Sequence, residues 1–222
     1  MNLKIKDIVD IEHTISKGLF LENTNFWDLI PKIKDYVINL GNSLDKSKYN
    51  EVKENVWVAN DAKIDESAHI IAPTIIDSGT EIRPSAYIRG GVIVGKNCVI
   101  GNSCELKNCI IFDNCQIPHF NYIGDSIMGY HSHIGAGVIV TNLKSDGSNV
   151  VIKNEDKKID TGLRKMGAII GNYVEVGCNS TLFPGTIIMP NVNVYPLTRV
   201  RGIIPSNSIV KSELEIVKKE EL

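Results

Sequence analysis

The sequence lacks an excess of charge of one sign and any long apolar run. Its 24 Lys and Arg residues nearly balance its 26 Asp and Glu residues, which gives a formal net charge of -2. A balanced chain exerts no general attraction on nucleic acid or on anionic membranes, so any phosphate recognition needs local cations. No stretch is apolar enough to cross a bilayer or resembles a signal peptide. We therefore expect a cytoplasmic protein that binds neither nucleic acid nor membrane.

Closely paired cysteines are also absent. The five cysteines are an odd number and lack the short paired spacing of a zinc site, so we expect free thiols and no bound metal. Four of the five fall within the repeat described next, which predicts a packing role. The five are Cys98, Cys104, Cys109, Cys115 and Cys178.

What the sequence does contain is an aliphatic residue at every sixth position from Ile64 to Val200. Two of the steps are five residues long, and a small or β-branched residue follows four positions after most of the aliphatic ones. Two positions of each six-residue unit therefore recur in the same register, which indicates a repeat architecture. The aliphatic series is Ile64, Ile70, Ile76, Ile82, Ile88, Val94, Ile100, Leu106, Ile111, Ile117, Ile123, Met128, Ile134, Val140, Ile170, Val176, Leu182, Ile188, Val194 and Val200.

A six-residue period predicts an all-β fold, a parallel β-helix with one short strand per hexapeptide. Each triangular coil would hydrogen-bond to the coils above and below, about 4.8 Å away, with the aliphatic residues pointing inward. A β-sandwich of short strands is the alternative, but sandwich strands do not hold a six-residue phase for this long. Parallel crossovers are normally right-handed, so the hand of the coil does not follow from the period.

The repeat divides the chain into three parts. Residues 1–55 precede it, and helical spacing over 26–41 predicts a helix closed by Gly41, with Pro31 in its first turn or at a kink. The coil is expected over residues 56–205. Residues 206–222 form a charged tail, for which we expect a short exposed helix.

The repeat is interrupted over residues 142–169 by a polar, lysine-rich segment. A loop of this length on a rigid coil suggests a function, such as closing a site in the groove formed with a neighbouring subunit. A surface β-hairpin without a ligand is the simpler alternative.

Histidines are the first candidates for chemistry because their charge changes near neutral pH. His13 and His69 fit solvated positions, whereas His119, His131 and His133 lie close together in sequence. A bare hexapeptide repeat requires neither the histidine nor the aromatic residues of the segment 117–125. Periodicity alone allows His119 to be either a turn residue or a catalytic one.

The segment 83–142 resembles the acetyltransferase domain of the bifunctional N-acetylglucosamine-1-phosphate uridyltransferase/glucosamine-1-phosphate acetyltransferase family. The resemblance rests on the five-residue steps and on the order of His119, Tyr122, Gly124 and Asp125. It implies a left-handed coil, a homotrimer, and acetyl transfer from acetyl-CoA to an amino-sugar phosphate without a metal. The segment from Phe26 is similar to the connector that follows the nucleotidyltransferase domain, which has no counterpart here, so we expect no uridyl transfer.

The resemblance also assigns roles to individual residues. It implies that His119 is the general base, that Glu105 orients its imidazole, and that the amide of Ala136 faces the thioester oxygen. The residues implied to bind the sugar phosphate are Arg83, Lys107, Tyr122, Asn142 and Lys144, and those along the acetyl-CoA groove are Cys178 and Pro196.

The chain departs from the family pattern at several positions. His133 stands where the family has asparagine, and Ser148 and Val151 stand where it has lysines, which Lys144 or Lys153 would have to replace. Pro118 replaces a small residue beside His119. These differences leave the identity of the amino sugar open.

Two other functions are compatible with a hexapeptide coil. One is a non-catalytic trimeric scaffold or sugar-nucleotide sensor, which the missing loop lysines favour and the retained Glu105, His119, Tyr122 and Asn142 disfavour. The other is a γ-type carbonic anhydrase that binds zinc through three histidines between subunits. Its sequence context is not matched here.

Overall fold

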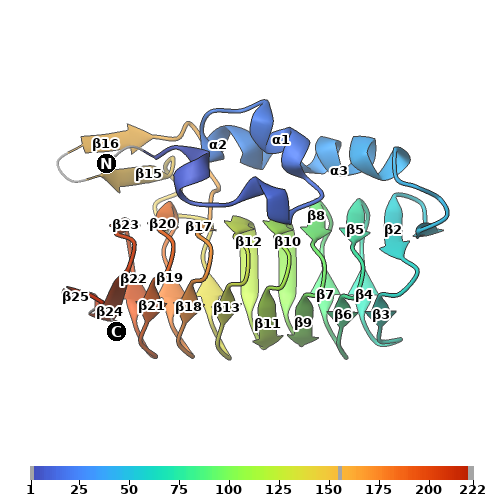
Figure 1. The fold of residues 1–222 in the computed structure, drawn as a ribbon. Helices are drawn as coiled ribbons and strands as arrows, with labels where there is room; N and C mark the ends of the chain where they lie inside the picture. The colour runs from blue at the N-terminus through green and yellow to red at the C-terminus, as the bar shows by residue number, and fades with distance from the viewer. Residues whose placement is uncertain (1–2, 155–156, 220–222) are drawn as a thin grey trace.

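The computed structural model describes residues 3–154 and 157–219. Over these residues the chain forms a left-handed parallel β-helix with a layer of short helices along one side and a hairpin at the far end of that side (Figure 1). The predicted all-β coil is confirmed. Within the described residues, no helix is long and apolar enough to span a membrane.

The coil has three faces, each a ladder of short parallel strands. Face 1 consists of β2 (Val56–Ala59), β5 (Thr74–Ile76), β8 (Val92–Val94), the second halves of β10 (Glu105–Ile111) and β12 (Tyr122–Met128), β17 (Ala168–Ile170), β20 (Thr186–Ile188) and β23 (Ile203–Ile204).

Face 2 consists of β3 (Lys63–Ile64), β6 (Glu81–Ile82), β9 (Val99–Asn102), β11 (Gln116–His119), β13 (His133–Ile134), β18 (Glu175–Val176), β21 (Asn193–Val194) and β24 (Ser208–Ser212). Face 3 consists of β4 (His69–Ile70), β7 (Tyr87–Ile88), the first halves of β10 and β12, β14 (Ile139–Val140), β19 (Thr181–Leu182) and β22 (Arg199–Val200).

The two five-residue steps shape the corner between faces 3 and 1. At this corner β10 and β12 bend from one face to the next without a break, and Asn108 and Asp125 adopt positive φ values of 48° and 49° there. Asn and Asp tolerate this left-handed region better than other non-glycine residues. The shortened repeat therefore makes a tight bend that places polar side chains at the corner.

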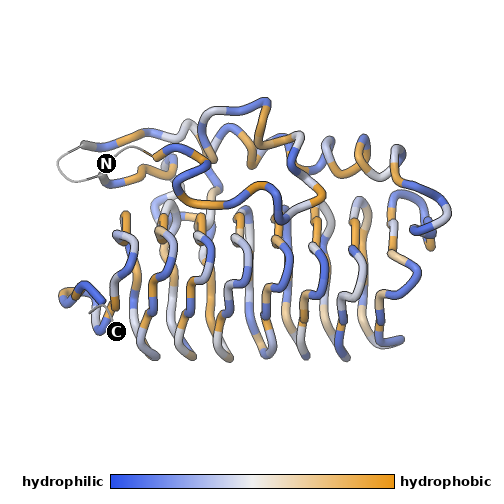
Figure 2. Tube along the Cα trace, viewed as in Figure 1, coloured by the Kyte–Doolittle hydropathy of each residue, from blue (hydrophilic) through white to orange (hydrophobic). Residues whose placement is uncertain are grey.

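The aliphatic series fills the interior of the coil. All but the first two members are buried, whereas Ile64 is 36% exposed and Ile70 is partly buried in the first coil. Face 1 carries a second buried row that points outward, toward the helices, and has no exposed surface. This row comprises Ile75, Ile93, Ile110, Ile127, Ile169 and Ile187. Figure 2 shows the resulting bands of hydrophobic residues along the coil.

The helical layer covers face 1. It consists of η1 (Ile5–Asp7), η2 (Ile11–His13), α1 (Lys17–Leu21), α2 (Phe26–Leu29), η3 (Ile30–Lys32) and α3 (Ile33–Asn42). Phe26, Leu29, Ile33 and Val37 are fully buried, and α3 contacts β5, β8 and β10. The predicted helix over 26–41 is thus present, but it is interrupted around Pro31 by one turn of 3-10 helix, as proline's missing N–H and fixed φ favour.

At each end of the coil, one of the three faces ends in an antiparallel strand. β1 (Tyr49–Lys53) pairs with β2, and β25 (Glu215–Lys218) folds back on β24. The prediction of a C-terminal helix is therefore wrong, and the coil continues through Ser212 instead of ending at residue 205. The physical reason is that β24 leaves backbone groups unpaired at the edge of the last coil, and a strand satisfies them whereas a helix does not.

The interruption at residues 142–169 contains a hairpin of β15 (Val151–Asn154) and β16 (Lys157–Asp160). The hairpin lies on the same side of the coil as the helices, next to β23 (Figure 1). Val150, Ile152 and Met166 are fully buried, which anchors the segment on its own coil.

The cysteines are thiols, as expected. Cys98, Cys104, Cys109 and Cys115 are buried and only Cys178 is exposed. Burial raises the pKa of Cys98, Cys104 and Cys109 above the ordinary thiol value, because a thiolate loses its hydration there. These side chains therefore stay neutral and act as small core residues.

The outward row on face 1 predicts a stability difference. Ile110→Ala should lower the free energy of unfolding by about 2–5 kcal/mol, because Ile110 is fully buried between the coil and the helices. Urea unfolding followed by circular dichroism measures this change. Ile139→Ala on face 3 is the matched control, since Ile139 is 36% exposed and should cost about 1 kcal/mol or less. Equal losses in the two variants would show that the helical layer does not seal face 1.

Candidate active site

His119 lies at the end of β11, at the corner between faces 2 and 3, and its side chain is exposed. Its amide donates a hydrogen bond to Oδ1 of Asn121 at 3.1 Å. Asn121 is 2% exposed, and its Nδ2 donates to the carbonyl of Gly135 at 2.7 Å. A buried asparagine thus fixes the backbone of His119 and ties it to the next coil.

Four of the residues predicted for catalysis and acetyl-CoA binding lie in one column along this corner. The amide of Gly137 donates to the carbonyl of His119, that of Asn179 to Ala136, and that of Leu197 to Cys178, at 2.8–3.0 Å. His119, Ala136, Cys178 and Pro196 therefore occupy equivalent positions on four successive coils, and we call this set the corner column.

Ala136 is the neighbour of His119 in the corner column. Its flanking amides, those of Gly135 and Gly137, donate to the coils on either side. Among the described residues the amide of Ala136 itself makes no hydrogen bond. The Ala136 amide lies one coil from the exposed imidazole of His119. It is therefore suited to donate a hydrogen bond to an oxygen atom that develops negative charge.

A second set of polar residues lies at the corner between faces 3 and 1. Asp125 is 5% exposed and is the centre of this group. Its carboxylate accepts hydrogen bonds from Lys107 Nζ at 3.1 and 3.3 Å, from Asn108 Nδ2 at 2.9 Å, and from Nδ2 of Asn142, which also lies 3.2 Å from the Tyr122 hydroxyl. We call these five residues the Asp125 cluster.

The pKa of Tyr122 is raised above the ordinary tyrosine value. Its partial burial is the main cause, the negative charges of Asp125 and Glu105 add to it, and the hydrogen bond with Asn142 opposes it. The hydroxyl therefore keeps its proton at neutral and mildly alkaline pH. In this state it can both donate and accept hydrogen bonds.

Glu105 and His119 flank the same corner on successive coils, since Glu105 pairs with Tyr122 and Asn102 pairs with His119. The Glu105 carboxylate, however, bonds Arg89 Nη1 at 2.7 Å, and the described residues show no hydrogen bond from it to the imidazole. In this chain the direct partner of Glu105 is thus an arginine.

The other predicted phosphate ligands are more scattered. Arg83 lies just before the corner column, two coils from His119, and its Nε bonds Glu81 Oε1 at 3.1 Å. Lys144 lies in the inserted segment. The structure therefore brings together Lys107, Tyr122 and Asn142 but not Arg83 or Lys144.

Arg89 and Asn108 are functional-site residues that were not predicted from the sequence. Arg89 follows the inward residue Ile88 as Lys107 follows Leu106, so its place in the repeat could have indicated that it lies one coil away on face 3. Asn108 could have been found from the five-residue step, which forces a polar residue into the bend.

The remaining two histidines do not converge with His119. His131 lies at the corner between faces 2 and 1, where its ring is 5.6 Å from that of Tyr173, and His133 Nδ1 lies 2.8 Å from Glu175 Oε2 on face 2. No group of three potential metal ligands is present within residues 3–154 and 157–219. Within one chain, a three-histidine zinc site of the carbonic anhydrase kind therefore has no geometric basis.

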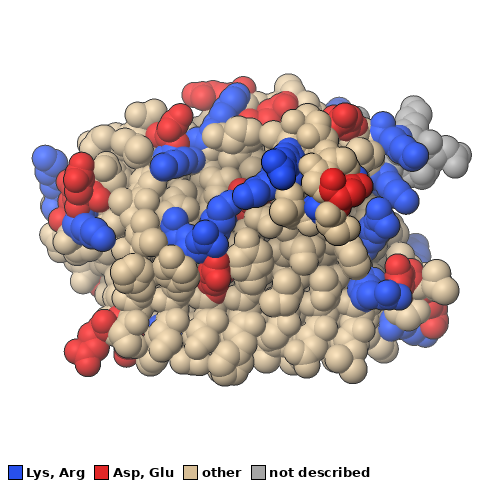
Figure 3. Space-filling view, turned by 180° about the vertical axis from the view of Figure 1, so that it is seen from behind, with Lys and Arg blue, Asp and Glu red and all other residues tan. Residues whose placement is uncertain are grey.

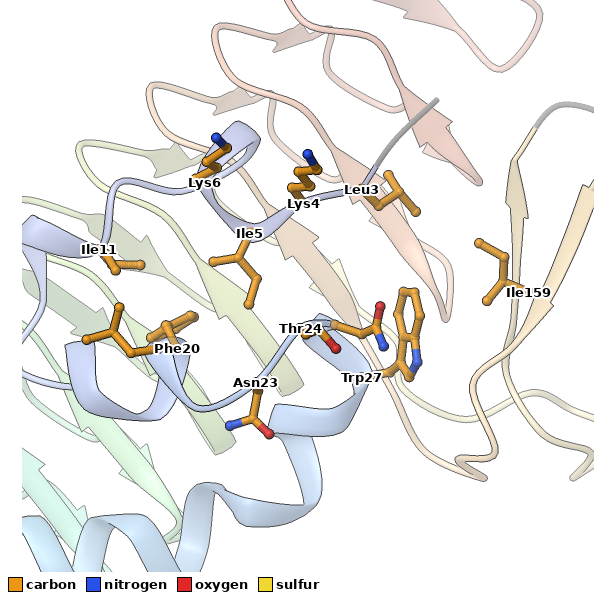
Figure 4. Close-up of a pocket in the computed structure, with 12 residues that line it drawn as sticks. Leu3, Lys4, Ile5, Lys6, Ile11, Phe20, Asn23, Thr24, Trp27 and Ile159 are labelled. Carbon is orange, nitrogen blue, oxygen red and sulfur yellow. The ribbon is translucent and has the colours of Figure 1, made fainter.

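A cavity of about 740 Å³ lies in the N-terminal layer, away from these groups. Its walls are mainly apolar, with Leu3, Ile5 and Ile11 on the N-terminal segment, Trp27 on α2 and Ile159 on the hairpin (Figure 4). None of the predicted site residues lines it.

The Asp125 cluster predicts a stabilising role for its carboxylate. Asp125→Asn keeps a residue that tolerates the positive φ but removes the charge that holds Lys107, Asn108 and Asn142. The free energy of unfolding should therefore fall by about 1–3 kcal/mol. Urea titration measures the loss. Asp146→Asn removes an exposed carboxylate 3.5 Å from Lys144 and should change stability much less than Asp125→Asn does. An Asp125→Asn protein as stable as the wild type would contradict the importance of the cluster.

Comparison with known proteins identifies relatives. The family model described as the GMPPB C-terminal domain matches residues 70–194. A bifunctional sugar-1-phosphate nucleotidylyltransferase/acetyltransferase from Sulfurisphaera tokodaii is 34% identical over 88% of this chain and 49% of its own length. The bifunctional protein GlmU of Methanococcus maripaludis is 32% identical over 98% of this chain and 57% of its own length.

Among solved structures, a mutant of AntD, an N-acyltransferase from Bacillus cereus in complex with dTDP and coenzyme A, aligns at 15% identity with a TM-score of 0.41. The alignment covers 79% of this chain and 91% of that one. At this sequence identity and TM-score, the likeness does not indicate which ligands this chain binds.

The chain spans about half the length of the curated relatives it matches. The family model covers more than half of the 222 residues, and the relatives exceed 30% identity over most of the chain. The chain belongs to the family described as the GMPPB C-terminal domain.

Proposed function

We propose that the chain transfers an acetyl group from acetyl-CoA to the amine of a sugar phosphate, with glucosamine-1-phosphate as the first candidate. The similarity to a bifunctional sugar-1-phosphate nucleotidylyltransferase/acetyltransferase and to GlmU supports the class of reaction. The single observation that carries the proposal is the corner column, in which an exposed imidazole and an unbonded amide stand on adjacent coils. Cys178 and Pro196 continue this column along the path proposed for acetyl-CoA.

The reaction needs a base and an oxyanion site. In the proposed mechanism the His119 imidazole takes a proton from the sugar amine as the nitrogen attacks the thioester carbonyl. The Ala136 amide then donates to the developing oxyanion, the carbon–sulfur bond breaks, and coenzyme A leaves as the thiol after receiving a proton. Imidazole is the side chain that enzymes use most often as a general base.

Glu105 is proposed to act on His119 mainly through its charge. A carboxylate one coil away at the same corner favours the imidazolium that forms during attack. Arg89 holds this carboxylate in place and reduces its net effect. The pair thus positions a negative charge near His119 without requiring a direct hydrogen bond.

The sugar side of the site is proposed to lie over face 3. Tyr122 and Asn142 offer hydroxyl and amide groups to the sugar hydroxyls. Lys107 and Arg89 supply positive charge for the phosphate from adjacent coils, and Arg83 approaches from the far side of the corner. Each cation already has an acidic partner, which keeps it oriented while the ligand is absent.

A homotrimer follows as part of the same proposal. The helices occupy face 1, so faces 2 and 3 are the surfaces on which the coil can meet a second copy. Packing face 2 of one chain against face 3 of the next would place a second wall beside the corner column. Three identical contacts of this kind close a ring.

The proposed base gives a direct test. Thiol release from acetyl-CoA should occur with glucosamine-1-phosphate, and His119→Ala should lower kcat by about a hundredfold or more. His69→Ala is the control, since this exposed histidine lies on β4, away from the corner column.

Turnover that survives His119→Ala would overturn the mechanism. Absence of turnover with glucosamine-1-phosphate, other amino-sugar phosphates and amino-sugar nucleotides would instead favour the non-catalytic scaffold. Turnover with a different acceptor would keep the reaction and change only the sugar.

Lys107 gives a second test, specific to the acceptor. Lys107→Gln should raise the KM for the sugar phosphate by about tenfold or more and leave the KM for acetyl-CoA unchanged, because a charged hydrogen bond to phosphate is lost. Steady-state kinetics with each substrate varied in turn measures both constants. A parallel rise of the two values would place Lys107 outside the sugar pocket.

A further inference from the structure

Asn121 lies two residues after His119 and is 2% exposed. Its Oδ1 accepts a hydrogen bond from the amide of His119 at 3.1 Å, and its Nδ2 donates to the carbonyl of Gly135 on the next coil at 2.7 Å. Both partners are main-chain groups of fixed polarity, which defines how the side-chain amide is oriented. One buried side chain therefore holds two successive coils at the corner that carries the proposed site.

The carbonyl of Gly135 and the amide of Ala136 belong to the same peptide group. This peptide is trans, and in a planar trans peptide the C=O and N–H bonds point in opposite directions. Since Asn121 is buried in the coil, the carbonyl that it binds points inward and the N–H of Ala136 points outward. The bond from Asn121 thus sets the direction of the proposed oxyanion donor.

The same bond makes the Ala136 amide a better donor. A hydrogen bond to the carbonyl oxygen polarises a peptide, and chains of such bonds strengthen one another in a low dielectric. Donors that are fixed before the reaction also need no reorganisation when the oxyanion forms. Asn121 supplies both effects without contact with the reacting atoms.

The main chain of Asn121 adds a third connection. Its carbonyl accepts from the amide of Glu105 at 2.8 Å, as part of the regular ladder between coils. His119, Glu105 and the peptide of Ala136 are therefore each one hydrogen bond away from Asn121.

Ser180 shows what this position of the repeat does elsewhere. It occupies the place of Asn121 two coils further along, and it is fully buried. Its Oγ donates to the carbonyl of Tyr195 at 3.1 Å and accepts from the amide of Thr198 at 3.2 Å. Both partners belong to the next coil, so a hydroxyl is sufficient to link two coils here.

Ser132 makes the same kind of link at the corner between faces 1 and 2. Its Oγ donates to the carbonyl of Gly171 at 2.7 Å and accepts from the amide of Val174 at 3.0 Å, again both on the next coil. Asn121 differs from these serines because its acceptor binds a residue of its own coil, His119. Linking the coils does not account for this second bond.

Few formal charges surround the corner column. In Figure 3 the lower edge of the molecule, opposite the helical layer, is uncharged along most of its length on this side. Where charged side chains are sparse, oriented main-chain dipoles contribute more of the field at a developing oxyanion. The direction of a single N–H is therefore important at this edge.

We propose that Asn121 is a positioning residue for acetyl transfer, which fixes the direction of the Ala136 amide together with the main chain of His119. This role rests on the proposed function, since it requires Ala136 to be the oxyanion donor. Because Asn121 is buried and touches no substrate, its loss should affect the transition state and leave substrate binding unchanged.

Asn121→Val tests this role, since Val138 fills the same place one coil further along without exposed surface. N121V removes both side-chain bonds and should lower kcat by about tenfold or more, with the KM of each substrate unchanged. N121S should recover most of the lost kcat, because a hydroxyl can donate to Gly135 as that of Ser180 does to Tyr195. Steady-state kinetics with acetyl-CoA and glucosamine-1-phosphate measures these constants.

Ser132→Ala is the matched control. It removes a buried bond between coils at another corner and should leave kcat unchanged. Equal losses of kcat in N121V and S132A would assign Asn121 a structural role only and overturn the proposal, as would an N121V enzyme with the kcat of the wild type. If N121V does not fold, N121A carries the same prediction.

A second measurement does not need turnover. The chain contains seven alanines, so selective ¹⁵N-alanine labelling gives few amide resonances, and Ala136→Gly identifies that of Ala136. This resonance should shift in N121V but not in S132A. An unchanged resonance in N121V would overturn the proposal. A wild-type protein inactive with every acceptor would instead remove the proposed function, and the resonance would still show whether Asn121 fixes this amide.

Discussion

Backbone hydrogen bonding between successive coils is the constraint on which this structure depends. Each coil must place its amides and carbonyls opposite those of its neighbours, so outside the inserted segment the chain returns to the same point after sixteen to eighteen residues. Residues far apart in sequence are then stacked in columns, and neighbouring residues of one column lie about 4.8 Å apart. Side chains that share a column act as one surface, and His119, Ala136, Cys178 and Pro196 form such a surface.

The same constraint explains why deviations from the repeat are informative. A coil of uninterrupted hexapeptides has uniform corners, whereas each five-residue step tightens one corner and places a polar residue in the bend. Asn108 and Asp125 occupy these tightened corners, and the Asp125 cluster forms around them. The inserted hairpin is a larger deviation and creates a cleft that a regular coil lacks.

Much of this could be predicted from the sequence, because inward side chains must be apolar at every strand. The period predicted the coil, and the resemblance pointed to His119 and to the Lys107, Tyr122 and Asn142 group. The partner of Glu105 was not predictable, since Arg89 reaches it from another coil. The C-terminal strand was missed because its charged sequence matches a helix as well as a hairpin, and only the unpaired edge of β24 decides between them.

The covered ends of the coil limit how this protein can assemble. A stack of parallel strands with two open edges is a template for indefinite growth, since each edge repeats the one before it. β1 blocks face 1 of the first coil at β2 and β25 blocks face 2 of the last coil at β24, both in the antiparallel sense that a further coil does not continue. On these two faces a second copy cannot add as the next coil, so neither face is a template for fibre growth.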